Sequence, residues 1–145
     1  MPRALFTGRG GGDTLALRAS DTLARYTFVR DSLFAGNDIP GAPRHHVVAG
    51  LRYAHPSGLS LAPTVEWVPR GFAVNSANTA TNAPWATLGL RAEWAEPRLG
   101  ATAFVQGVNL ADRRYAASVQ VDNAVGRYFE PADGRAVYAG LRVAR

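Results

Sequence analysis

Apolar and polar residues alternate with a period of two along much of this chain, which is the pattern of a β-strand with two different faces. In residues 46–53, Val47, Leu51 and Tyr53 lie on one face, and Arg52 lies on the other with smaller and polar residues. Three more stretches alternate in the same way, residues 59–67, 86–94 and 137–143. No stretch contains the run of about 18 apolar residues that a transmembrane helix requires. The pattern therefore predicts an all-β protein.

Two other stretches alternate less cleanly. Residues 99–110 form a predicted strand in which Phe104 lies on the same face as polar residues. Residues 14–29 begin with regular alternation, but the phase is lost around Asp21. We expect a β-bulge there, because one extra residue in a strand inverts the faces that follow it. Residues 3–7 are expected to be the end of one more strand.

Connections between the predicted strands alternate between short and long. The short ones are residues 55–58 and 95–98, and the long ones are residues 31–44, 69–84 and 111–134. Transmembrane β-barrels have this organisation, with short periplasmic turns and long external loops. Tyr53, Trp67 and Trp94 lie near strand ends on the apolar faces, where a barrel has its aromatic girdles. A soluble β-sandwich also has alternating strands, so the periodicity alone leaves both architectures open.

Length and composition narrow the choice of function. The chain has 145 residues, enough for one domain, and no cysteine, which excludes disulfides and thiol catalysis. Its net charge is +5, but the basic residues are scattered and form no stripe, so we do not expect nucleic-acid binding. The first 13 residues lack the long apolar segment of a secretion signal.

Several segments, taken in order, resemble the C-terminal part of TonB-dependent outer-membrane receptors. They are NLADRRY (109–115), GRYFEPADGR (126–135), VYAGLRV (137–143), IPGAPRHHVVAGLRY (39–53), PSGLSLAPTVEWV (56–68) and NSANT (75–79). The resemblance runs from about residue 14 to the end of the chain. It implies antiparallel up-and-down strands of a transmembrane β-barrel, about six or seven of the C-terminal strands of a 22-stranded barrel.

The resemblance also implies a location and a set of partners. Residues 1–145 would be part of the barrel domain, with the plug domain and the signal peptide absent, in contact with lipid of the cell outer membrane. Such receptors import scarce metal chelates, most often ferric siderophores, and TonB acts on them through the plug that is missing here. The chain ends in Val143-Ala144-Arg145 instead of the aromatic residue typical of the family. We therefore expect poor membrane insertion and no transport by this chain alone.

Candidate chemistry inside the strands is sparse. His45 and His46 point to opposite faces, and His55 lies at the far end of the same strand, so we expect no metal site. Glu66 and Glu93 share the inward face with arginines. A glycosidase pair of carboxylates is one interpretation, and an ion-paired lining of the barrel interior is the one we favour. No nucleophile motif is present, so we predict neither catalysis nor a cofactor.

The external loops hold the candidate binding residues, because loops on a rigid scaffold often carry binding sites. Arg127, Tyr128 and Phe129 combine a cation with aromatic faces, which suits an anionic, aromatic iron chelate. Phe72 and Asn75, in the preceding loop, are expected to add to this site. In the alternative interpretation, Tyr128 and Phe129 only pack the loop onto the barrel rim. Two other functions stay open: a small autonomous porin-like barrel and a soluble β-sandwich that binds a ligand.

Overall fold

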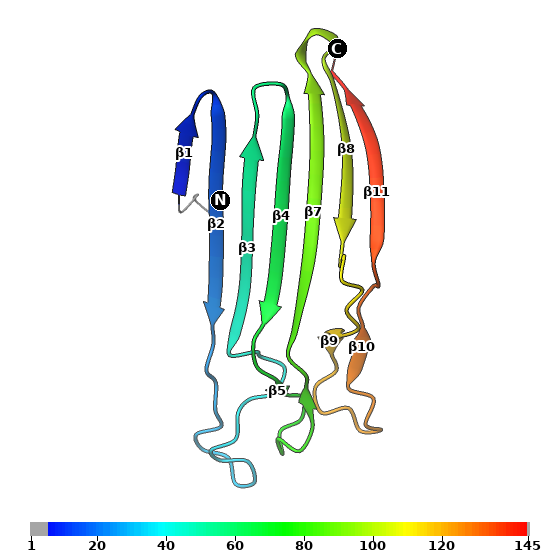
Figure 1. Ribbon diagram of the computed structural model, residues 1–145. Helices are drawn as coiled ribbons and strands as arrows, with labels where there is room; N and C mark the ends of the chain where they lie inside the picture. Colours follow the sequence, from blue (N-terminus) through cyan, green and yellow to red (C-terminus); the bar gives the residue numbers. More distant parts are fainter. Residues whose placement is uncertain (1–5, 145) are drawn as a thin grey trace.

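The computed structural model describes residues 6–144, and its main feature is one antiparallel sheet (Figure 1). Seven strands form it in the order β1-β2-β3-β4-β7-β8-β11, and each strand is hydrogen-bonded to the strands next to it in this order. Their bounds are β1 Phe6–Gly10, β2 Asp13–Leu23, β3 His45–Ala54, β4 Leu59–Val68, β7 Trp85–Glu96, β8 Ala101–Val108 and β11 Ala136–Val143. The predicted all-β, up-and-down arrangement is confirmed. Within the described residues β1 and β11 are edges that do not pair with each other, so the sheet is open.

Short and long connections lie at opposite ends of the sheet (Figure 1). The short turns, at residues 11–12, 55–58 and 97–100, lie at the end where the chain terminates; the last contains a 3-10 helix, Pro97–Leu99. The long loops, residues 24–44, 69–84 and 109–135, lie at the other end. They contain two small sheets, β5 Phe72–Ala73 with β6 Thr81–Asn82, and β9 Ala116–Val119 with β10 Phe129–Pro131. The alternation expected from the sequence is confirmed.

Residues 6–144 include no helix with the length and apolar character needed to cross a membrane.

The bulge expected around Asp21 is absent from β2, and this prediction was wrong. The register of β2 on β3 runs without a shift from Thr14 opposite Ala54 to Leu23 opposite His45. Asp21 stays on the apolar face because it lies near the strand end, where its carboxylate bonds His45 Nδ1 at 2.9 Å. The strand also stops at Leu23 and does not reach residue 29. The strand expected at residues 3–7 is observed from Phe6 onwards as β1, and residues 3–5 lie outside the described part.

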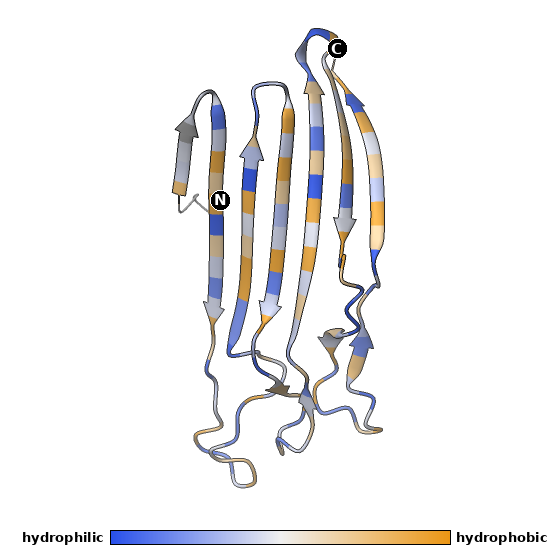
Figure 2. Cartoon of the chain, in the orientation of Figure 1, coloured by the Kyte–Doolittle hydropathy of each residue, from blue (hydrophilic) through white to orange (hydrophobic). Residues whose placement is uncertain are grey.

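Apolar and polar residues alternate along the long strands (Figure 2), and the register places the apolar residues of neighbouring strands on one face. Opposite Val65 lie Ala49 on β3 and Leu88 on β7, and Val105 of β8 lies opposite Ala92. Although apolar, this outer face is open to solvent: Leu88 is 43% exposed, Val105 51% and Leu141 69%. Similar exposure is found for Leu15, Leu17, Leu51, Leu61, Trp67, Leu90, Trp94, Val137 and Val143.

The total surface shows how unusual this is for a chain in water. The accessible surface is 10333 Å² for 15.5 kDa, whereas a folded soluble monomer of this mass exposes about 7,200 Å². Part of this excess of roughly 3,000 Å² is the exposed apolar outer face, which spans the strands of the sheet, whereas the largest apolar patch of a typical monomer is about 300–600 Å². The outer face therefore requires a cover that residues 6–144 do not supply.

The opposite, inner face mixes charged, small and aromatic residues. Arg91 donates to Gln106 Oε1 at 2.9 Å, pairs with Glu93 at 2.6 Å and lies over the Phe104 ring at 4.0 Å. The Phe104 ring covers Gly140, where an added Cβ would meet ring carbons at 2.6 Å. This packing explains why Phe104 lies among polar residues in β8, and why β11 has a glycine opposite it.

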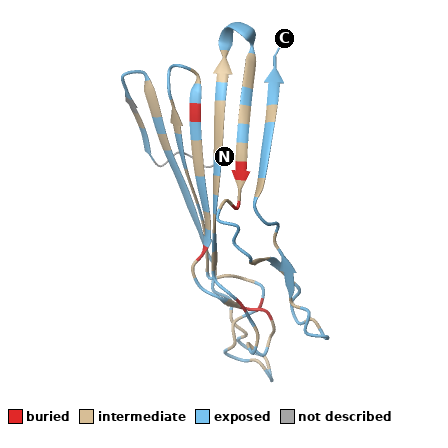
Figure 3. Cartoon of the chain, turned by 45° about the vertical axis from the view of Figure 1, so that its right-hand side comes forward, coloured by how far each residue is buried: buried red, intermediate tan, exposed pale blue. Residues whose placement is uncertain are grey.

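The buried apolar residues among those described lie where the strands meet the loops (Figure 3). Val68 at the end of β4, Ala73 in β5 and Val74 are 2%, 8% and 0% exposed. A soluble domain of this length would instead have its core between packed layers. The packed centre of this molecule is thus in its loops, and the sheet itself is a single layer.

Gly58 provides a test of how the short turns hold the sheet. It has a φ of +90°, and an added Cβ would collide with the backbone oxygen of Ala95 near the end of β7. We expect Gly58→Ala to lower the free energy of unfolding by about 2 kcal/mol, measured by urea unfolding in detergent. Gly10→Ala is the control, because nothing lies within 4 Å of its added Cβ. Equal stability of the two variants would contradict this view of the turn.

Candidate functional site

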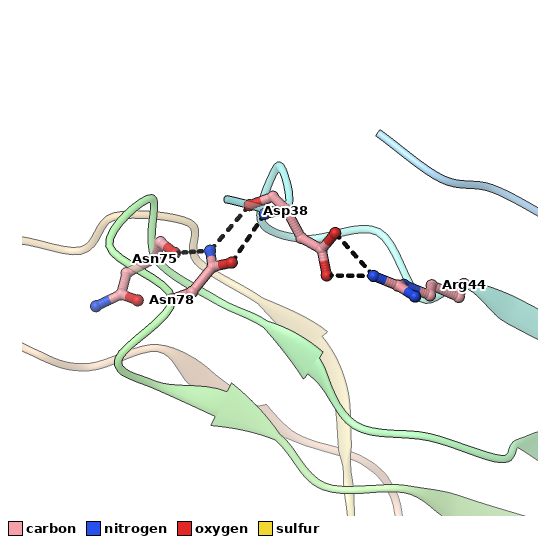
Figure 4. Close-up of polar contacts among 4 residues, drawn as sticks. All are labelled: Asp38, Arg44, Asn75 and Asn78. Atoms are coloured by element: carbon pink, nitrogen blue, oxygen red, sulfur yellow. Dashed lines mark hydrogen bonds and ion pairs between the residues drawn. The ribbon is translucent and has the colours of Figure 1, made fainter. Parts of the chain in front are cut away.

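The three long loops are joined to one another by hydrogen bonds, beginning with Asn78 (Figure 4). The Asn78 amide donates to the Asp38 carbonyl at 2.9 Å and accepts from the Asp38 N–H at 2.8 Å, as a neighbouring strand would. The same Nδ2 donates to the Asn75 carbonyl at 3.1 Å. Asp38 in turn accepts from Arg44 Nη2 with both carboxylate oxygens at 3.0 Å. These contacts fix the first loop against the middle loop.

The middle loop is also fixed to the last loop, through Asp122. Its carboxylate accepts from the Ser76 N–H and the Ser76 hydroxyl, both at 2.7 Å, while its own N–H donates to the Val74 carbonyl at 3.1 Å. Asp122 also has a positive φ of 51°, a conformation that short polar residues tolerate. Residues 24–44, 69–84 and 109–135 therefore form one connected unit around the buried Val74.

A recess of about 550 Å³ opens between this loop unit and the inner face of the sheet. Its walls include Trp85 and Tyr115, whose ring centroids are 4.3 Å apart at an interplanar angle of 31°. On the polar side, His46 Nε2 and Glu66 Oε1 are 2.7 Å apart. We call this the aromatic recess; Phe72 and Asn82 also line it.

A second recess of about 400 Å³ adjoins the first, since Asn82, Tyr115 and Ala116 line both. Arg113 and Arg114 line it together with Phe129, and we call it the arginine recess. Within residues 6–144, neither of these arginines takes part in an ion pair. The two recesses thus differ in charge: one holds a carboxylate and the other two guanidinium groups.

Tyr115 is the residue common to these recesses and to a third one, of about 500 Å³, that reaches Asp133. Burial raises the pKa of the Tyr115 hydroxyl above its ordinary value, and the nearby Glu66 and Asp133 carboxylates raise that pKa further. The hydroxyl is therefore protonated at neutral pH and can donate a hydrogen bond.

The structure distributes the five residues predicted to bind ligand over different places. Phe72 lines the aromatic recess and Phe129 lines the arginine recess. Phe129 also contacts Tyr128 edge to face, with ring centroids 6.2 Å apart. Arg127 is exposed in the last loop, and its N–H donates to Asn123 Oδ1 at 3.1 Å. Asn75 bonds within its own loop, where Oδ1 accepts from the Thr79 N–H at 2.9 Å. Arg127, Tyr128 and Asn75 lie outside the walls of both recesses.

The three histidines have separate partners: His45 bonds Asp21, His46 bonds Glu66, and His55 bonds Ser57 at 2.7 Å. The described residues contain no group of three or more His, Asp or Glu that could hold a metal ion. Glu66 and Glu93 do not share a partner, because Glu93 bonds Arg91.

Sequence reasoning assigned no role to Trp85 or Tyr115, although Trp85 lines the aromatic recess and Tyr115 lines both recesses. Tyr115 ends the NLADRRY segment, and Trp85 follows a proline at the start of β7. Both are aromatic residues at the junction of a strand with a long loop, and that position is the signal that was available. Their stacking joins residues thirty positions apart, which local alternation does not reveal.

Comparison with known proteins supports the fold. No family model and no curated protein sequence matches the chain. Among solved structures, the ferric yersiniabactin uptake receptor FyuA from Yersinia pestis is similar over 91% of this chain, with a TM-score of 0.67 and 20% sequence identity. The match covers 20% of that receptor, so this chain spans about a fifth of its length. At this identity the likeness shows the fold alone, an antiparallel sheet similar to part of that structure.

The contact between Asp122 and Ser76 gives a pH-dependent prediction. Hydrogen bonds from the Ser76 hydroxyl and the Ser76 N–H lower the pKa of the Asp122 carboxyl. A lowered folded-state pKa means that the contact adds stability above the unfolded-state pKa, and that this stability is lost as pH falls through the folded-state pKa. We expect Ser76→Ala to raise the Asp122 pKa toward its ordinary value in an NMR titration of the carboxyl carbon. Ser57→Ala, in a short turn at the opposite end of the sheet, should leave the Asp122 pKa unchanged. An unchanged Asp122 titration midpoint in Ser76→Ala would disprove the hydrogen bond from the Ser76 hydroxyl.

Proposed function

We propose that residues 1–145 form part of the wall of an outer-membrane receptor barrel whose loops bind a metal chelate, such as a ferric siderophore. The observation that carries this proposal is the apolar outer face, which the register aligns over all seven strands and which remains exposed. The likeness of the chain's fold to a ferric yersiniabactin uptake receptor agrees with this proposal. The function is binding and transport, not catalysis.

Lipid is the cover that best suits the outer face. A β-sandwich would need a second sheet over it, but the long strands of residues 6–144 all belong to one sheet. The aromatic residues of this face, Tyr53, Trp67 and Trp94, lie near strand ends, where a membrane has its polar interfaces. The outer edges of β1 and β11 would pair with further strands of the same barrel, which removes open hydrogen-bonding edges from the lipid.

The ligand would be captured at the loop end. Arg127 with Tyr128 and Phe129 offers a cation and aromatic faces to an anionic chelate, and Phe72 and Asn75 belong to the adjoining loop. The loop unit is held together by its own hydrogen bonds, so little ordering is needed when a ligand binds. Uptake would then use energy that TonB transmits through a plug domain of the whole receptor.

The membrane part of the proposal is tested at Leu90, in the middle of β7 on the outer face. We expect Leu90→Arg to destabilise the vesicle-embedded chain by about 2–4 kcal/mol, because the charge would enter hydrocarbon. Thr87→Arg on the inner face is the control, with an expected loss below about 1 kcal/mol. The measurement is reversible unfolding from lipid vesicles. Equal losses for both variants, or full solubility of the chain without detergent, would favour a soluble sandwich.

The ligand part is tested at Arg127 with ferric tris(catecholate), an anionic aromatic iron chelate. We expect Arg127→Gln to weaken binding to the full chain in detergent about two- to fivefold, the range of an exposed ion pair. Arg98→Gln, in a short turn at the opposite end of the sheet, should bind like the parent. Equilibrium dialysis measures both. Identical affinity of Arg127→Gln and the parent would remove Arg127 from the site.

A further inference from the structure

We propose that the aromatic recess and the arginine recess together form one binding site for a planar aromatic group that carries a hydrogen-bond donor at one end and an anionic group at the other. The inference rests on the proposed receptor function and names the kind of ligand group that this end of the wall accepts. The site lies between the loop unit and the inner face of the sheet, separate from Arg127.

The aromatic walls set the shape of the ligand. The Trp85 and Tyr115 rings are tilted by 31° at a centroid distance of 4.3 Å, and both border the aromatic recess. Phe72 lines the same recess from the middle loop. Because these two rings stack on each other, a ligand ring would lie against their edges or outer faces, where a flat aromatic ring makes offset or edge-to-face contact. The volume of about 550 Å³ lies within the range of small-molecule sites.

Glu66 sets the chemistry at one end. Its Oε1 is engaged by His46 at 2.7 Å, so its second oxygen remains as a charged acceptor at the recess. A carboxylate binds a hydroxyl or amino group of the ligand through a charge-assisted hydrogen bond and repels an anion. The donor end of the ligand therefore belongs in the aromatic recess.

Arg113 and Arg114 set the chemistry at the other end. They follow each other in the segment that leads into β9, and both line the arginine recess without an ion-pair partner among residues 6–144. Guanidinium groups bind carboxylates with two parallel hydrogen bonds. Tyr115 and Asn82 border both recesses, so the recesses adjoin, and a ligand that spans them would contact both ends.

The test uses the full chain in detergent with Trp67→Phe and Trp94→Phe, which leaves Trp85 as the sole remaining tryptophan of three. The NMR shift of the Trp85 indole N–H then reports occupancy of the aromatic recess. The probes are 4-hydroxybenzoate, which has both ends, benzoate, which lacks the donor, and phenol, which lacks the anion. We expect half-saturation by 4-hydroxybenzoate at about tenfold lower concentration than by either of the others.

Two variants assign the ends. In Glu66→Gln, the half-saturation concentration of 4-hydroxybenzoate should rise to about that of benzoate. In the double variant Arg113→Gln, Arg114→Gln, it should rise to about that of phenol. Arg98→Gln is the matched control for lost positive charge and should keep the tenfold preference. Equal half-saturation by the three probes, or a preference unaffected by the arginine variants, would overturn the proposal. If such a result is obtained while Leu90→Arg still destabilises the vesicle-embedded chain more than Thr87→Arg does, it rules out this binding site but not the proposed receptor wall.

Discussion

The alignment of apolar residues on one continuous face of the sheet is the constraint on which the rest of the molecule depends. The apolar side chains lie together on this face only because each strand is in register with the next. A slip of one residue in a strand would turn the apolar residues of that strand to the other face. Short turns with little freedom, such as the one at Gly58, help to keep that register. Under the proposed function, lipid takes the place of a second protein layer over this face.

The loop unit is held together by different interactions from the sheet. Its buried apolar side chains include Ala73 and Val74, next to Val68 at the end of β4, and this small core does not by itself organise three long loops. Polar contacts from single side chains take over that role: Asn78 pairs with the Asp38 backbone as a strand would, and Asp122 binds Ser76. The recesses next to the sheet are therefore formed by hydrogen-bonded loops on a rigid rim.

The sheet was predictable from the sequence, because alternation with a period of two is a local property. It located β3, β4, β7 and β11 to within one or two residues. The error around Asp21 arose because a polar residue near a strand end was read as a shift of phase, whereas it has His45 as its partner. The recesses were not predictable: Trp85 meets Tyr115 through folding of the last loop, and no spacing in the sequence records that contact. Arg127 and its neighbours remain a prediction.

The linkage of the loops through Asn78 and Asp122 limits how the proposed binding end can diversify. A loop that stands alone can be lengthened, shortened or exchanged without effect on its neighbours. Here, replacement of residues 69–84 would remove the partners of both Asp38 and Asp122, and the two outer loops would lose their positions as well. New specificity would therefore arise either by exchange of all three loops as one cassette, or by substitutions within the recess walls that leave the cross-links in place.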